Sequence, residues 1–167
     1  MSVYTDPLPT LASGELPDPD KWADILLALG ALYDAPTAYT PIWTGSSTNA
    51  VLGNSVLTGE YSQLGKIVFV RIRLFIGNSG VTIATGVWRF TLPVAPVADQ
   101  VIAALFNDAS LVTRFAGQCW LINGLATGDN MRIVYSGESG FANQTNALPV
   151  AAAAGDTLIL QGRYTAQ

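Results

Sequence analysis

The chain has 167 residues, a length that fits one sandwich domain with an appendage better than two domains. Half of the residues are hydrophobic, only 12% are charged and the mean hydropathy is +0.35, so we expect copies of the chain or another protein to cover part of the surface. No apolar run approaches the roughly 20 residues of a transmembrane helix, and the first residues do not resemble a signal peptide. We therefore expect that the chain does not insert into a membrane. We also expect that it assembles in a cytoplasm.

Several classes of catalytic and ligand site lack the residues that they need. The chain has no histidine, and its single cysteine, Cys119, lies in an apolar run, so it is predicted to be a buried thiol and not a nucleophile or metal ligand. Four carboxylates remain conceivable for glycoside hydrolysis, but they lie in or beside glycine-rich turns, where a solvated carboxylate is ordinary. They are Glu60, Asp129, Glu138 and Asp156. We therefore predict a non-enzymatic protein with no catalytic residue, no metal and no cofactor.

Charge is distributed unevenly along the chain. Residues 1–39 have a net charge of −5, whereas residues 40–167 have a net charge of +1. The basic residues are scattered and no phosphate-binding glycine motif is present, so no nucleic-acid partner is expected. The proline-rich stretch before Pro19 predicts an extended arm that docks onto a basic surface, with a merely solvated arm as the alternative. We divide the chain into an anchoring arm, residues 1–38, and a β domain, residues 39–167.

One short helix is predicted over about residues 19–34 of this arm. Asp18 can cap its first turn, Pro19 suits the first helical position, and Pro36 ends it. Four apolar residues follow the a/d spacing of a short coiled coil and are assigned to an oligomer or anchor helix. They are Trp22, Ile25, Leu29 and Leu32. Packing against its own β domain is the alternative, and because two heptads cannot hold an oligomer alone, the β domain would have to share in self-association.

From residue 39 onward the hydrophobic pattern changes to a period of two. Strands are predicted at residues 56–64, 66–76, 86–92, 101–106, 111–122, 131–135 and 157–164, with glycine and asparagine turns between them. We expect Trp43, Trp88 and Trp120 in the core, with stacking on sugars as the alternative. The chain is therefore expected to be mainly β, an antiparallel β-sandwich or jelly roll preceded by the arm and one short helix.

The strand at residues 66–76 has two different faces. Val68, Val70, Ile72, Leu74 and Ile76 form one face and are predicted to lie in the core. The opposite face mixes aromatic and basic side chains, namely Phe69, Arg71, Arg73 and Phe75. Because exposed phenylalanines on a solvated sheet are costly, we expect this face in a subunit interface, with the arginines as ion-pair partners.

Three groups of motif residues follow one another in the β domain. The opening W-T-G, followed by G-N and L-x-G-x-Y-x-x-x-G-K, is formed by Trp43, Thr44, Gly45, Gly53, Asn54, Leu57, Gly59, Tyr61, Gly65 and Lys66. The strand motif W-x-F-x-L-P is formed by Trp88, Phe90, Leu92 and Pro93, and the closing motif G-D-x-L-x-x-x-G-x-Y by Gly155, Asp156, Leu158, Gly162 and Tyr164. Over most of residues 39–165 the chain thus resembles the β domain of minor tail and virion-surface proteins of tailed bacteriophages. Leu11, Gly14 and Trp22 resemble the N-terminal segment of such proteins.

The resemblance implies a homotrimeric jelly roll on a virion, either a capsid decoration protein or a minor tail protein. Its arm would attach the trimer to other virion proteins of the capsid or tail. The motifs are turns and core positions, so they identify no ligand. The alternative function is host attachment by a receptor-binding module, in which the loops at residues 124–130 and 137–146 bind a host-surface glycan.

Overall fold

The computed structural model describes residues 19–33, 35–124, 131–137, 140–147 and 149–167, so the predicted extended arm at residues 1–18 lies outside it. Within these residues, one helix precedes ten strands. These are α1 (Pro19–Tyr33), β1 (Thr37–Tyr39), β2 (Trp43–Gly45), β3 (Val56–Leu64), β4 (Ile67–Phe75), β5 (Trp88–Phe90), β6 (Gln100–Asp108), β7 (Thr113–Leu121), β8 (Met131–Gly137), β9 (Gly140–Asn143) and β10 (Thr157–Thr165). The prediction of a mainly β chain with one short helix is confirmed.

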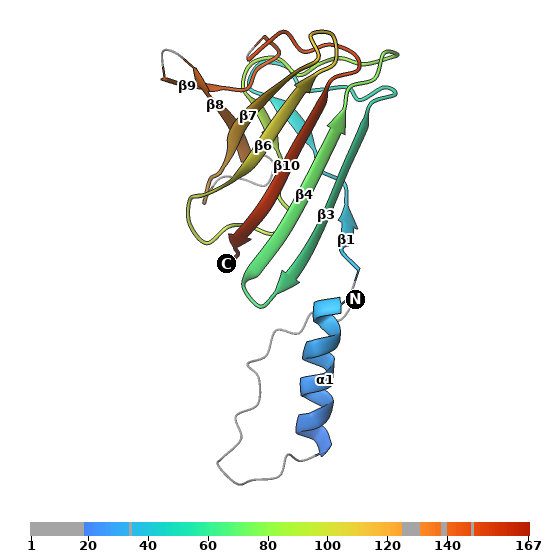
Figure 1. Cartoon of the computed structure of the whole chain (residues 1–167), viewed down its shortest axis with the longest axis vertical. Helices are drawn as coiled ribbons and strands as arrows, with labels where there is room; N and C mark the ends of the chain where they lie inside the picture. Colours follow the sequence, from blue (N-terminus) through green and yellow to red (C-terminus); the bar gives the residue numbers. More distant parts are fainter. Residues whose placement is uncertain (1–18, 34, 125–130, 138–139, 148) are drawn as a thin grey trace.

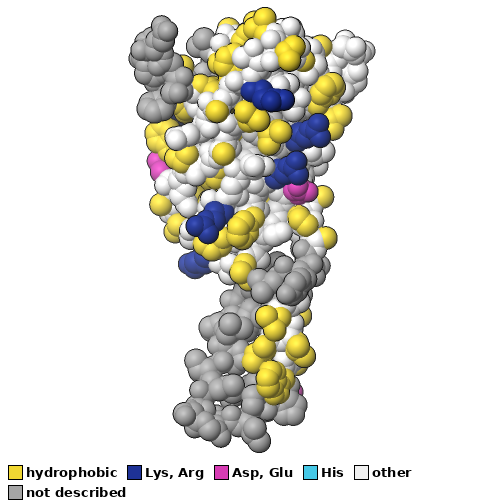
Figure 2. Space-filling model, viewed as in Figure 1, with side chains coloured by type: hydrophobic (Ala, Val, Ile, Leu, Met, Phe, Trp, Pro, Cys, Tyr) yellow, Lys and Arg dark blue, Asp and Glu magenta, His cyan; other side chains and the backbone are white. Residues whose placement is uncertain are grey.

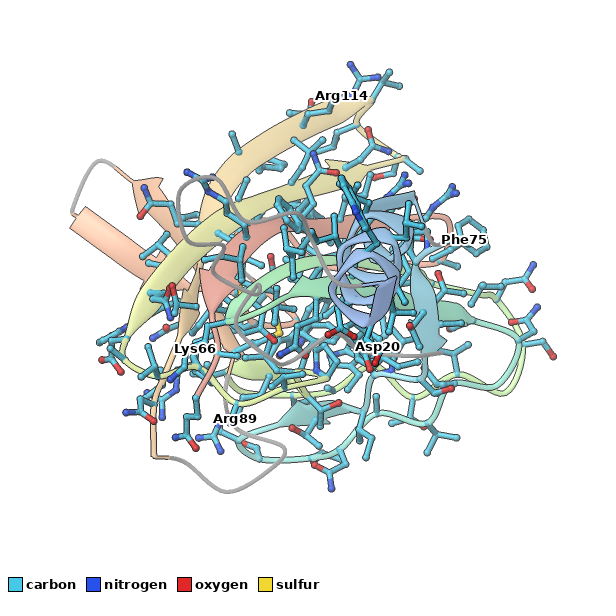
Figure 3. All side chains as sticks on the ribbon, turned by 90° about the horizontal axis from the view of Figure 1, so that it is seen from below. Asp20, Lys66, Phe75, Arg89 and Arg114 are labelled. Carbon is cyan, nitrogen blue, oxygen red and sulfur yellow. The ribbon has the colours of Figure 1, made fainter. Side chains whose placement is uncertain are left out.

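All ten strands belong to one antiparallel sheet. Their order is β1-β3-β4-β10-β6-β7-β8-β5-β2, with β9 beside β8. The sheet curls on itself and its two halves enclose one core, which gives a β-sandwich (Figures 1 and 3). No helix in the described part of the chain is long and apolar enough to cross a membrane.

The alternation predicted for the strand at residues 66–76 is confirmed in β4. Its inward side chains are all less than 5% exposed and belong to the core; they are Val68, Val70, Ile72 and Leu74, with Ile76 following the strand. β4 pairs with β3 on one side and β10 on the other along its whole length. The long flanking strands therefore place the whole outward side of β4 in the middle of a broad sheet surface.

Aromatic side chains from both halves of the sheet meet in the core. Trp88 is fully buried, its ring centroid lies 4.7 Å from that of Trp43 and 6.4 Å from that of Phe106, and its Nε1 donates to the carbonyl oxygen of Ala84 at 2.7 Å. The prediction of a core position is thus confirmed for Trp43 and Trp88. These contacts tie β2 and β5 to β6, which lies in the other half of the sheet.

The third tryptophan contradicts the prediction of a core position. Trp120 is 43% exposed, whereas its neighbours Cys119 and Leu121 are fully buried. All three residues are apolar enough to be inside, but only alternate side chains of a strand can share one face, and β7 turns Cys119 inward. Burial raises the pKa of the Cys119 thiol above its ordinary value, which agrees with the prediction of a buried, unreactive cysteine.

Three short strands were not predicted. β1 and β2 have three residues and β9 has four, too few for a periodic pattern to be recognised. The sheet consequently begins at Thr37, two residues before the predicted domain boundary at Tyr39. β1 pairs with β3, and the ring of Tyr39 packs over Gly59 of β3, where a side chain at position 59 would clash with that ring. β9 lies within residues 137–146, which were predicted to form a loop.

Candidate functional site

The outward side of β4 carries the four residues that were assigned to a subunit interface. We call Phe69, Arg71, Arg73 and Phe75 the β4 outer face. Phe69 is 48% and Phe75 is 40% exposed, and Figure 3 shows Phe75 pointing away from the sheet. Figure 2 shows basic side chains among apolar ones on this side of the molecule.

Neighbouring strands extend the apolar part of this surface. Val56 of β3 is exposed directly opposite Phe75, and Leu64 is exposed opposite Ile67. Large apolar side chains therefore stand at both ends of the β3–β4 hairpin, with the arginines between them. A hydrophobic patch interrupted by charge is typical of a surface that another protein covers.

The two arginines of the β4 outer face differ in their partners. Arg71 Nη1 lies 3.5 Å from Glu60 Oε1, and both side chains are about half exposed, so this ion pair contributes little to the stability of the fold. Arg73 has no ion-pair partner among the described residues and lines a depression of about 310 Å³ with Pro36, Thr58 and Glu60. Ion pairs between subunits stay a prediction, and the cation of Arg73 is available for one.

The helix presents its apolar side chains to solvent. Trp22 is 50% and Leu29 is 47% exposed, Ile25 is half-buried, and the side chain of Leu32 lies outside the described set. Figure 1 shows α1 beyond the end of the sheet, and a Cβ at Gly30 would meet no atom within 4 Å. The alternative in which α1 packs on its own β domain is therefore not what the structure shows.

Two of the four carboxylates considered for hydrolysis, Glu60 and Asp156, lie in the described part of the chain, and their surroundings differ. Glu60 is a surface partner of Arg71, whereas Asp129 and Glu138 lie outside the described residues. Asp156 is fully buried and accepts hydrogen bonds from the backbone N–H groups of Ala109 at 2.9 Å and Ala153 at 2.8 Å. The prediction of a solvated turn carboxylate was wrong for Asp156, which instead joins two loops at the start of β10. Within the described ranges, no three His, Cys, Asp or Glu residues are grouped so as to hold a metal ion.

Asp108 forms a similar clamp in the turn between β6 and β7. Its Oδ1 accepts from the Ser110 hydroxyl at 2.7 Å, from the Leu111 N–H at 2.9 Å and from the Ser110 N–H at 2.8 Å. The hydroxyl of Ser110, followed by the N–H of Leu111, holds the pKa of Asp108 below its ordinary value. The turn therefore favours the ionised carboxylate.

We expect this clamp to make the stability of the β domain depend on pH. Because the native pKa of Asp108 is depressed, its stabilisation is complete above the unfolded-state pKa of about 3.9 and is lost as the pH falls through the native pKa. Urea unfolding at pH 7 and pH 3 should show that Asp108→Asn costs more stability at pH 7. Ser110→Ala should reduce the same pH dependence in part. An equal cost of Asp108→Asn at both pH values would contradict the prediction.

Sequence reasoning missed a depression on the other half of the sheet. It has a volume of about 360 Å³ and is lined by Val101, Gln118, Trp120, Val134 and Asn143. The glycan-binding loops predicted at residues 124–130 and 137–146 lie partly outside the described residues, so the structure does not place them as a site. Cys119 and Trp120 are adjacent in β7, and adjacent side chains of a strand point to opposite faces. The exposure of Trp120 could therefore have been inferred only by assigning Cys119 to the inner face first.

Comparisons with known proteins identify no relative: no family model, no curated protein and no solved structure matches the chain.

Proposed function

We propose that the protein is a homotrimeric structural protein of a bacteriophage virion, either a capsid decoration protein or a minor tail protein, whose N-terminal arm attaches it to the particle. The observation that carries the proposal is the pair of exposed apolar surfaces, one on β4 for self-association and one on α1 for attachment. The motif resemblance over residues 39–165 supports the virion context.

The β4 outer face supports association through the β domain. Burying one phenylalanine side chain contributes about 1.5–3 kcal/mol, so Phe69 and Phe75 together can supply a substantial part of a subunit contact. Arg71 and Arg73 place two positive charges between the phenylalanines. Because these charges must meet complementary groups on the second copy, they favour one register of association over others. This surface belongs to rigid paired strands, so little conformational entropy is lost when a second copy covers it.

The arm and the helix support a second role, attachment. α1 exposes Trp22 and Leu29, and the first 39 residues hold the entire excess of negative charge. A helix this short is marginal by itself, so it gains stability when its apolar side is covered by the partner. The sheet therefore serves self-association, and the arm with its helix serves attachment to the particle.

The available chemistry favours this structural role over catalysis. The chain has no histidine, and the pKa of its only thiol is raised by burial. Asp108 and Asp156 bind backbone N–H groups of their own loops. The carboxylates in the core region thus stabilise turns, and we propose no enzymatic activity.

Light scattering on the full chain and on a version that begins at Ala35 tests the proposal. The shortened version keeps β1, which a cut at Tyr39 would damage. Both are expected to have three times the mass of one chain, which is 17.6 kDa for the full sequence. A monomeric full chain contradicts the proposal, and a monomeric shortened version assigns assembly to the helix.

The virion location is tested separately by mass spectrometry of purified phage particles. This measurement should detect the chain, and its absence from the particles would contradict the proposed virion location.

A further inference from the structure

Four strands converge on the depression around Trp120. In the register of the sheet, Trp120 of β7 stands opposite Val101 of β6, and Gln118 of β7 stands opposite Val134 of β8. Val134 is in turn paired with Asn143 of β9. The side chains that line the depression are therefore held by hydrogen-bonded strands, and the exposed indole of Trp120 lines it together with the side-chain amides of Gln118 and Asn143.

The two amides are free to bind a ligand. Within the described part of the chain, no hydrogen bond is formed by the side chain of Gln118 or Asn143. Six other side-chain amides in the described part of the chain donate hydrogen bonds to oxygen atoms of the protein; they are Asn54, Gln63, Gln100, Asn123, Gln144 and Gln167. Gln118 and Asn143 thus differ from amides that stabilise the fold, and both line the same depression as Trp120.

We propose that this depression is a saccharide-binding site, in which a pyranose ring stacks on the indole of Trp120 while Gln118 and Asn143 bind its hydroxyl groups. A pyranose has an apolar face of C–H groups, which suits the electron-rich face of an indole. Its hydroxyls both donate and accept, and an amide offers a donor and an acceptor side by side. Val101 and Val134 border the ring with apolar surface.

Other ligand classes fit the depression less well. A purely apolar ligand would cover the amides of Gln118 and Asn143 without hydrogen bonds, which costs free energy. Among the described residues, no acidic or basic side chain lines the depression, and Arg132, which stands opposite Trp120 in the register of β7 and β8, is not one of its lining residues. A second copy of the chain is the competing occupant, and the experiment below separates the two. The site lies within one chain and does not depend on the trimer proposed above.

The inference is tested with labelled full-length protein on an array of neutral hexoses, N-acetylhexosamines, and uronic and sialic acid oligosaccharides. We expect binding to at least one pyranose class, and Trp120→Ala should weaken the apparent affinity at least about tenfold. Gln118→Ala and Asn143→Ala should each weaken it about fivefold. Trp120→Phe should restore part of the loss, because an aromatic face is regained. Leu111→Ala removes an exposed apolar side chain from the β6–β7 turn and should leave binding unchanged.

Three results would overturn the inference. The first is the absence of binding to every sugar on the array, and the second is binding that Trp120→Ala leaves intact. The third is a Trp120→Ala protein with a lower solution mass than the original chain, because the depression would then be a contact between copies. Circular dichroism of each variant verifies that the fold is retained.

Discussion

Replacing Phe69 and Phe75 together by glutamate is expected to dissociate the proposed trimer. Two lost burials of about 1.5–3 kcal/mol each correspond to a subunit affinity that is roughly 10²–10⁴-fold weaker. The new carboxylates would also be desolvated in the interface, which adds to the loss. Both side chains are exposed in the single chain, so the fold itself should be retained. Light scattering should therefore show a folded monomer.

The matched control for this experiment is Leu111→Glu, which places the same charge on an exposed apolar position outside the β4 outer face. It should leave the mass unchanged. If the double glutamate variant keeps the mass of a trimer, the β4 outer face is not the interface. Leu29→Glu on α1 then identifies whether the helix holds the copies together instead.

Replacing Trp88 by alanine is expected to cost about 3–5 kcal/mol of unfolding free energy, the range for a large aromatic residue removed from a core. Trp88 is fully buried, contacts Trp43 and Phe106, and its removal leaves the carbonyl oxygen of Ala84 without its indole donor. Because a domain is stable by about 5–15 kcal/mol, such a loss can leave the fold marginal. Urea unfolding followed by circular dichroism measures it.

Two further variants make this measurement specific. Trp88→Phe keeps an aromatic ring and should lose less stability than the alanine variant, although the bond to Ala84 is gone in both. Trp22→Ala removes a half-exposed indole from α1 and should change the unfolding of the β domain by no more than about 0.5 kcal/mol. A cost below about 1 kcal/mol for Trp88→Ala would show that the two halves of the sheet do not depend on this contact.

For the motif residues, the sequence predicted their location in the fold better than their hydrogen-bond partners. Trp88 was predicted to lie in the core and is buried, and the motif residue Tyr164 is buried as well. The sequence could not show that the Tyr164 hydroxyl donates to the carbonyl oxygen of Val94 at 2.7 Å, or that Asp156 binds a loop 47 residues away. Such partners are brought together by strand order, which local patterns do not contain.

The sequence by itself determined the elements with strong local signals. The period of two in β4 is sufficient to assign Val68 and Ile72 inward and Phe69 outward, and proline at both ends is sufficient to delimit α1. The tertiary structure alone decided which of Cys119 and Trp120 faces inward, that β9 brings Asn143 beside Val134, and that the ring of Tyr39 packs over Gly59. The physical reason is that alternation defines two faces of a strand, but when both faces are apolar, only the packing of the whole curled sheet decides which one is buried.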